Sequence, residues 1–229
     1  MQQDPEPNSP KPSDLRPEPF LETSRDSRLR TTAMHPTLPL QHDHTAILHH
    51  ILEEYALPPS GDHGVRHWAR VMENGLRIAE ANGADPEVVA LFALFHDARR
   101  VNEYTDHGHG LRGGDLAREL RGSLVHLSGE QFDRLHEACR LHTRGFISAE
   151  PTLAACWDAD RLDLGRVGIT PDPDLLCSDA ARALLPWAHE RARSDRAPGD
   201  RSGHPDPGEP RLGQSALTAM RQFLRAHRS

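Results

Sequence analysis

The chain is poor in cysteine and has no long apolar run. Its three cysteines are odd in number and lie in apolar, helix-like surroundings, so we interpret them as small buried side chains in a reducing compartment rather than as a disulfide framework. No segment approaches the roughly 18 to 20 apolar residues that span a bilayer, and the first residues lack the basic-then-apolar order of a secretory signal. We therefore expect a cytoplasmic protein that makes no contact with a membrane.

An excess of positive charge is also missing. The formal net charge is -7, whereas proteins that bind nucleic acid in general concentrate surplus Lys and Arg on one face. This balance argues against general nucleic-acid binding but leaves a nucleotide substrate open. Histidine, by contrast, is plentiful: the chain has 16 copies of the side chain that most often binds transition metals.

Proline marks two segments that we expect to lie outside the folded domain. Residues 1–41 are rich in Pro, Ser and charge and show no apolar period, which predicts disorder, with Met34 as an alternative start. Residues 193–213 are rich in Pro and Gly, which is typical of a long exposed loop. The rest fits one domain over residues 42–192, and residues 214–229 are expected to return as a helix that packs on it.

Between these segments, apolar residues recur at intervals of three and four. The expected helices cover residues 47–55, 65–83, 86–95, 110–121, a stretch after Ser128, 153–164 and 175–189. Asp85 before Pro86 predicts a capped helix start, and Ser128 with Gln131 predicts a capping box. No alternating strand pattern of useful length occurs. The expected class is therefore all-α, a compact multi-helix bundle.

His96 and Asp97 close the most apolar of these helices. An ionisable pair is costly there unless it is satisfied, and coordination of a metal is one way to satisfy it. Because adjacent residues on a helix point about 100° apart, both side chains can reach an ion beyond the helix surface. For a lone His-Asp pair, capping and hydrogen bonding would be the better interpretation. The surrounding motifs shift the balance toward a metal.

Three motifs stand in a fixed order along the chain. They are His67-Trp68-Ala69-Arg70-Val71, Leu94-Phe95-His96-Asp97 and Asp158-Ala159-Asp160-Arg161-Leu162-Asp163. With the order His, His-Asp, Asp, the chain resembles the HD-domain metal-dependent phosphohydrolases over residues 42–190. It is similar above all to a bacterial subgroup, through His63-Gly64-Val65-Arg66-His67-Trp68, His96-Asp97-Ala98-Arg99-Arg100, Asp106 and His109-Gly110. The resemblance implies an HD-type helical bundle that holds a divalent metal.

Carried over residue by residue, the resemblance implies four metal ligands: His67, His96, Asp97 and Asp160. Asp160 is preferred because it precedes a basic residue and Leu, as in the family's final motif, while Asp158 and Asp163 remain alternatives. The expected ion is Mn, Fe, Zn, Co, Ni or Mg, of which Mg is least favoured by imidazole.

In HD proteins with two metals, further histidines bind the second ion and the motif aspartate bridges both. That resemblance would make Asp97 the bridge, with His109 and His142, or His126, completing a second site. His109 and His142 are alternatively expected to contact substrate. His63, four residues before His67, is expected to support a ligand or contact substrate, with an ordinary loop histidine as the alternative.

Hydrolysis also needs groups that move protons and neutralise phosphate charge. Glu103 and Asp106 follow the His-Asp helix and are the candidate catalytic acid or base, with a solvated loop as the alternative. Arg99 and Arg100 are candidates for a phosphate clamp, one of them facing solvent.

The pattern as a whole favours a phosphohydrolase in which a metal-activated water attacks a small phosphorylated metabolite or nucleotide. The alternatives are a di-iron oxygenase on the same fold and a non-enzymatic module whose metal serves folding or sensing. Two specialised activities are disfavoured, because the chain lacks the Gly-Tyr-Pro extension of cyclic dinucleotide phosphodiesterases and the Glu-Asp pair that follows His-Asp in guanosine tetraphosphate hydrolases. A monomer and a homo-oligomer are both compatible with the sequence.

Overall fold

The structure is a computed structural model that describes residues 36–194, 217, 218, 220–222, 224 and 225. Of the predicted tail over residues 1–41, residues 1–35, with the alternative start Met34, lie outside this range, as do residues 195–213 of the predicted loop over residues 193–213. The described residues depart from both predictions: Leu40 is buried in the core, and residues 193 and 194 end helix α8. In the region of the predicted C-terminal helix, the described residues have helical backbone, and Met220 and Leu224 are buried in the hydrophobic core.

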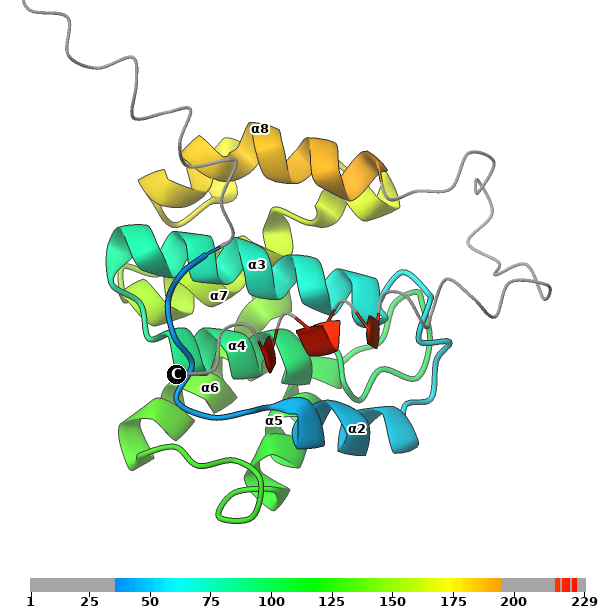
Figure 1. The fold of residues 1–229 in the computed structure, drawn as a ribbon. Coiled ribbons are helices and arrows are strands. Elements are labelled where there is room, and N and C mark those ends of the chain that lie inside the picture. Colours follow the sequence, from blue (N-terminus) through cyan, green and yellow to red (C-terminus); the bar gives the residue numbers. More distant parts are fainter. Residues whose placement is uncertain (1–35, 195–216, 219, 223, 226–229) are drawn as a thin grey trace, which may run out of the picture. The chain divides into compact units, whose positions relative to one another are not determined.

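The described part of the chain consists of α-helices and short 3-10 helices, without a named β-strand. In chain order these elements are α2 (Thr45–Glu53), α3 (Val65–Asn82), α4 (Pro86–Phe95), α5 (His109–Glu119), α6 (Gly129–Leu141), η1 (His142–Arg144), α7 (Pro151–Arg161), η2 (Leu164–Val167), η3 (Pro173–Leu175) and α8 (Asp179–Ser194) (Figure 1). The predicted all-α class is confirmed. Among the described helices, none is long and apolar enough to cross a bilayer.

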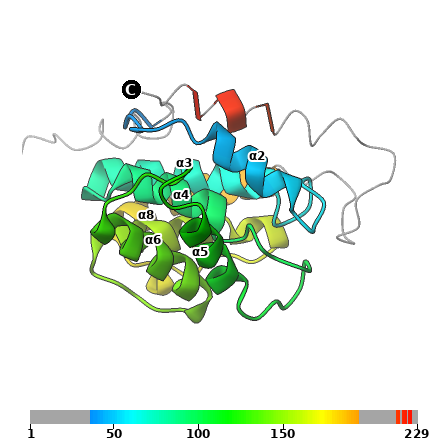
Figure 2. The ribbon, with the colours of Figure 1, turned by 90° about the horizontal axis from the view of Figure 1, so that it is seen from below.

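Helix α4 lies at the centre of the bundle. Its residues from Glu87 to Phe95 are buried, and it packs against α3, α5, α6 and α7 (Figures 1 and 2). The helix starts as predicted: Pro86 occupies the first turn, and the Asp85 carboxylate accepts hydrogen bonds from the N–H groups of Glu87 and Val88. A helix that is apolar all round is stable only when other elements cover it on all sides. This covering fixes the position of the residues that follow Phe95.

Five helix ends that carry candidate ligands meet near the end of α4. The ligands occupy the first turn of α3, the C-cap of α4, the first residue of α5, the first residue of η1 and the last turn of α7; they are His67, His96, His109, His142 and Asp160. The four histidines are buried. Because helices joined by short connections run antiparallel, starts and ends of successive helices alternate at one end of a bundle.

Helix α5 comes too close to its neighbours for any residue larger than glycine at two positions. A Cβ atom on Gly113 would lie 2.0 Å from the carbonyl oxygen of Phe95, and one on Gly110 would lie 2.1 Å from the carbonyl oxygen of Cys139. Both obstacles are backbone atoms, which cannot turn aside as a flexible side chain can. The two glycines therefore let the start of α5, with His109, approach the ends of α4 and α6.

Helix α8 begins at Asp179, four residues later than predicted. The Asp158 carboxylate accepts hydrogen bonds from the N–H groups of Cys177 (2.7 Å) and Ser178 (3.0 Å). The Ser178 hydroxyl oxygen in turn accepts a hydrogen bond from the N–H group of Ala181, as a helix N-cap does. These bonds hold residues 177 and 178 outside the helix, and they occupy Asp158 in a structural role.

Candidate metal centre

His67 and His96 each present one ring nitrogen to a shared space. His67 Nδ1 lies 2.7 Å from a carboxylate oxygen of Asp163, and His96 Nδ1 lies 3.1 Å from the carbonyl oxygen of Phe92. Because these oxygens accept hydrogen bonds, the network assigns the proton of each ring to Nδ1. Each Nε2 then carries a lone pair, and the two Nε2 atoms lie 3.0 Å apart.

His109 and His142 repeat this arrangement on α5 and η1. His109 Nδ1 lies 2.6 Å from the carbonyl oxygen of Asp106, and His142 Nδ1 lies 2.7 Å from the carbonyl oxygen of Cys139. Both Nδ1 atoms therefore donate to backbone, and both Nε2 atoms carry lone pairs. These two Nε2 atoms also lie 3.0 Å apart.

The spacing of the nitrogen atoms within each pair suits a shared metal ion. Two lone pairs that face each other at 3.0 Å repel, and two acceptors form no hydrogen bond. Two nitrogens that each lie about 2.1 Å from one six-coordinate ion, at right angles to each other, are about 3.0 Å apart. The separation within both pairs is therefore that of two ligands of one ion.

Asp97 lies between the two pairs and turns one oxygen to each. Its Oδ2 lies 3.6 Å from His67 Nε2 and 3.7 Å from His96 Nε2, while its Oδ1 lies 3.1 Å from His109 Nε2 and 3.9 Å from His142 Nε2. Oδ1 is buried and has no hydrogen-bond partner among the described residues. Nη1 of Arg100 lies 3.5 Å from Oδ1, but a buried carboxylate oxygen that faces two lone pairs remains costly unless a cation lies between them. The residues present thus fit a metal.

Two sets of potential ligands share this carboxylate. We call His67, His96 and Asp97 the first group, and Asp97, His109 and His142 the second group; in each, the ligand atoms all lie within 4.8 Å of one another. Asp160 extends the first group, because its Oδ1 lies 3.4 Å from His67 Nε2 and 4.0 Å from His96 Nε2. Of the three carboxylates in the final motif, Asp160 is the one that faces the Nε2 atoms of the first group.

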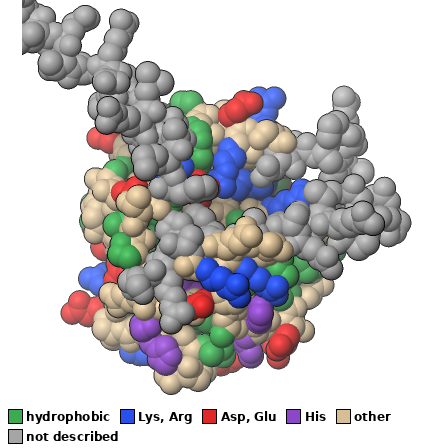
Figure 3. Space-filling view, in the orientation of Figure 1, with side chains coloured by type: hydrophobic (Ala, Val, Ile, Leu, Met, Phe, Trp, Pro, Cys, Tyr) green, Lys and Arg blue, Asp and Glu red, His purple; other side chains and the backbone are tan. Residues whose placement is uncertain are grey.

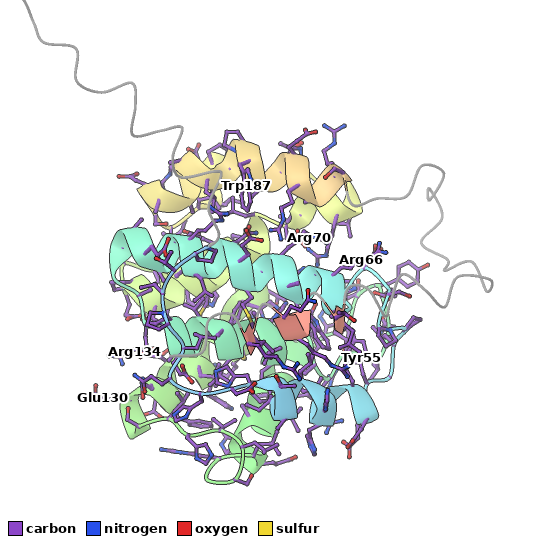
Figure 4. The ribbon with its side chains drawn as sticks, in the orientation of Figure 1. Tyr55, Arg66, Arg70, Glu130, Arg134 and Trp187 are labelled. Carbon is purple, nitrogen blue, oxygen red and sulfur yellow. The ribbon has the colours of Figure 1, made fainter. Side chains whose placement is uncertain are left out.

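Asp163 supports a ligand and leaves the metal space to Asp160. One of its oxygens accepts the hydrogen bond from His67 Nδ1, and the other lies 2.5 Å from Nε of Arg70 on α3 (Figure 4). A carboxylate bound in this way fixes the tautomer and the orientation of the imidazole ring. Arg70 follows His67 by three residues and shares its helix face, which is the signal that would have predicted this contact from the sequence.

The charge states suit metal binding. Burial lowers the pKa of His67 well below the usual value, and burial lowers the pKa of His142 to about 4, so both rings are neutral near pH 7. Burial alone would raise the pKa of Asp97, but the neighbouring imidazoles of His96, His109 and His67 outweigh it and the pKa lies well below the usual value. Neutral imidazoles and an ionised carboxylate are the forms that bind metals.

His63 and Glu103, predicted separately, form a pair in the structure. His63 Nδ1 lies 2.5 Å from Glu103 Oε2, and the His63 ring centroid lies 6.3 Å from that of His67. The hydroxyl of Tyr55, in the connection after α2 (Figure 4), donates a hydrogen bond to the carbonyl oxygen of His63. These contacts anchor Glu103 beside the candidate metal centre rather than in a solvated loop.

Asp106 and Arg99 are each engaged by a side chain outside the two histidine pairs. The Asp106 carboxylate accepts two hydrogen bonds from Arg112 and one from the N–H group of Val101, so it anchors the loop before α5. Arg99 pairs with Glu54 at 2.5 Å, at the surface. The sequence expected one of the two arginines to face solvent; the structure places Arg99 at the surface and Arg100 at the site.

A cavity of about 310 Å³ opens next to both groups. Asp97, His142 and Asp160 line it on the side of the ligands. Apolar residues of the segments after α7 form part of its wall. Three arginines also line it: Arg100, Arg161 and Arg166. The sequence reasoning missed Arg166, which is nearly buried and whose Nε donates a hydrogen bond to the carbonyl oxygen of Asp62. Its signal was its spacing of three residues from Asp163.

His126, the alternative ligand for a second site, lies elsewhere. Its ring stacks at a tilt against His42, with the centroids 5.5 Å apart. It belongs to neither group of potential metal ligands. The second group is therefore completed by His109 and His142 rather than by His126.

Comparison of the chain with protein-family models, with curated proteins and with solved structures found no match.

Proposed function

We propose that this chain is a metal-dependent phosphohydrolase of the HD-domain type, acting on a small phosphorylated metabolite or nucleotide. The observation that carries the proposal is the placement of Asp97, which offers one oxygen to each of two histidine pairs beside a cavity lined by arginines. The order His, His-Asp, Asp along the chain adds support, because the helical bundle brings these residues together. The shape and the charge of the site both suit an anionic substrate.

The chain's own ligands define which metals it would hold. One ion would take the first group and Asp160, and a second would take the second group. Such mixed imidazole and carboxylate ligation suits Mn, Fe, Zn, Co or Ni better than Mg. When bound, a divalent ion supplies Lewis acidity, which polarises a phosphoryl oxygen and makes water more acidic.

The arginines of the cavity would neutralise the charge of the phosphate. Nη2 of Arg100 and Nη2 of Arg161 each donate to a backbone carbonyl oxygen, as does Nε of Arg166. These bonds fix the guanidinium groups before substrate arrives, so that little reorganisation is needed when charge builds up on the phosphoryl oxygens. A cavity of about 310 Å³ favours a small ligand.

A small ligand is also consistent with the surface. On the face shown in Figure 3, basic side chains form small groups interspersed with acidic ones rather than one broad basic area. With a formal net charge of -7, this arrangement gives little general attraction for a nucleic-acid backbone. The arginines of the cavity provide positive charge locally instead.

The pair of His63 and Glu103 is the proposed proton carrier. A carboxylate 2.5 Å from an imidazole nitrogen is placed to exchange a proton with it. Placed beside His67, the pair would accept a proton as water attacks and return it to the leaving oxygen. Glu103 thus keeps the catalytic role that its position in the sequence predicted, with His63 as its partner.

Two other functions share parts of this arrangement. Two metal groups joined by one carboxylate would also suit a di-iron oxygenase. A metal that relieves the repulsion between facing lone pairs would stabilise the fold even in a protein that is not an enzyme. The arginine-lined cavity favours the phosphohydrolase over both alternatives.

The proposal is tested by phosphate release from a panel of phosphomonoesters and nucleotides with added Mn²⁺. We expect turnover by the full-length chain that Asp97→Asn abolishes and Asp115→Asn retains, because Asp115 lies on α5 in a partly exposed contact with Arg118 and His136. Metal binding without turnover on any compound would indicate the non-enzymatic module. Oxygen consumption by the iron-loaded protein would indicate the oxygenase.

A further inference from the structure

The two groups differ in the charges that surround them. The first group has two carboxylates that face its imidazoles, Asp97 and Asp160. Two arginines stand close to it: Arg70 is bound to the carboxylate of Asp163, and Arg166, whose charge also acts on His67 and Asp160, lies 3.8 Å from the same carboxylate. Among the described residues, the second group has the shared carboxylate of Asp97 within ligand distance, while Asp160 acts on His142 from farther away. A guanidinium group lies directly against Asp97 and His109.

That guanidinium belongs to Arg100. Its Nη1 lies 3.3 Å from His109 Nε2 and 3.5 Å from Asp97 Oδ1, which are two of the three ligand atoms of the second group. Nη1 thus donates toward the lone pair that a metal would use. The charge of an arginine is permanent at any physiological pH, so this competition does not depend on protonation.

The guanidinium is also held in place. Its Nε donates to the carbonyl oxygen of Asn102 at 3.3 Å, and its Nη2 donates to the carbonyl oxygen of Tyr104 at 2.5 Å. The residue is buried, with 7% of its surface exposed. Nη1 consequently cannot leave the second group without breaking two backbone contacts or moving into the adjoining cavity, which Arg100 also lines.

We infer that Arg100 is the residue that sets the affinities of the two groups apart, so that the chain binds one divalent ion tightly in the first group and a second ion at least tenfold more weakly. The inference rests on the metal centre of the proposed function, but not on any turnover. The reason is electrostatic: a divalent ion in the second group is repelled by a fixed positive charge, whereas one in the first group is attracted by two carboxylates. Arg100 is therefore a positioning residue for metal occupancy.

The test is a titration of the metal-free, full-length protein with Mn²⁺, followed by calorimetry and by equilibrium dialysis with metal analysis. In the wild type we expect one tight ion and a second whose affinity is at least tenfold lower. Arg100→Gln removes the charge and should strengthen the second event by about tenfold, leaving the first unchanged. Arg100→Lys keeps a positive charge and should leave the second event weak.

Arg99→Gln is the matched control, because it removes the same charge from the neighbouring residue, whose side chain pairs with Glu54 at the surface. It should bind metal as the wild type does. If the wild type bound two Mn²⁺ ions with equal affinity, that result alone would overturn the inference. It would also be overturned by an Arg100→Gln variant that is folded by circular dichroism and keeps the weak second event, or by an Arg99→Gln variant that strengthens it equally. Failure of the wild type to bind any ion would instead refute the metal centre itself.

Discussion

The first and second groups of ligands have the same local geometry on different supports. His67 and His96 stand on α3 and α4, whose packing forms the centre of the core, and both are 0% exposed. His109 and His142 stand at the start of α5 and in η1, and they are 5% and 6% exposed. In both pairs the Nε2 atoms lie 3.0 Å apart.

The geometry of each candidate metal site and its affinity for metal therefore depend on different contacts. The hydrogen bond of each Nδ1 atom sets the geometry, and three of the four acceptors are backbone carbonyl oxygens. The affinity for metal depends on the charges nearby, which are the carboxylate of Asp160 at the first group and the guanidinium of Arg100 at the second. Substitutions that change both groups, or only one of them, test whether geometry and affinity depend on different contacts.

The largest effect is expected where the two groups meet. Asp97→Asn removes the only ligand that they share, so both metals should be lost and turnover should fall by more than about 100-fold, beyond the range for changes to residues that merely support ligands. Metal analysis and steady-state kinetics measure both effects. Retention of one full equivalent of tightly bound metal by this variant would contradict the bridging position of Asp97.

Acid should destabilise the metal-free protein before its carboxylates titrate. An unfolded histidine binds a proton below about pH 6.5, whereas His142 in the fold, with its pKa lowered to about 4 by burial, does so only near that value. Between these limits the unfolded state binds more protons, so the free energy of unfolding should fall as pH falls, by about 3 kcal/mol for this residue. The depressed pKa of His67 acts in the same direction.

Urea unfolding of the metal-free protein at pH 7 and pH 4.5 measures this loss. The His142→Gln variant has one fewer buried imidazole to protonate and should show a smaller decrease over the same interval. An equal decrease in both proteins would show that His142 is not held neutral by the fold.

The helical class and the central position of α4 followed from local signals in the sequence. The run of apolar residues after Asp85 and Pro86 predicted a buried helix, and the structure buries it. The start of α8 was misplaced because Asp158 holds residues 177 and 178 by contacts that bridge about twenty positions of the chain. Such contacts leave no trace in the local periodicity of the sequence.

The candidate ligands were predicted from sequence motifs, but the roles of the residues around them became clear only from the three-dimensional structure. The sequence proposed Glu103 and Asp106 on equal terms, and only the structure separates them, because Asp106 is bound by Arg112 and Glu103 by His63. Arg166 was missed because its spacing of three residues from Asp163 indicates that the two side chains are close but not that Arg166 faces a cavity. Local patterns identify the type of a residue, whereas its partners depend on the packing of distant helices.

The second group should be the more sensitive to the packing of α5. Gly113→Ala places a Cβ atom against the carbonyl oxygen of Phe95, so α5 must move away, at a cost of about 2 kcal/mol in unfolding free energy. Binding of metal to the second group should weaken while the first stays intact. Denaturant unfolding and metal titration measure the two effects.

Gly129→Ala is the matched control for this substitution. Gly129 is the first residue of α6, and a Cβ atom there would meet nothing nearer than a side-chain nitrogen of Arg121 at 4.0 Å. The unfolding free energy should remain the same or rise slightly, since alanine favours helix more than glycine does. If both glycine variants lost the same stability, the close approach of α5 would not explain the position of His109.

The smallest effect, confined to the first group, is expected from Asp163→Asn. This change keeps the size of the side chain but removes the charge that fixes the His67 ring and pairs with Arg70, so metal affinity at the first group should fall by about tenfold. The second group should be unaffected, as should both groups in the control Asp174→Asn, whose side chain is exposed in η3. The affinities of the two groups would then become more nearly equal because the first is weakened. Arg100→Gln should also bring them closer, by strengthening the second. Equal weakening of both groups would mean that Asp163 acts on the whole centre through the fold rather than through His67.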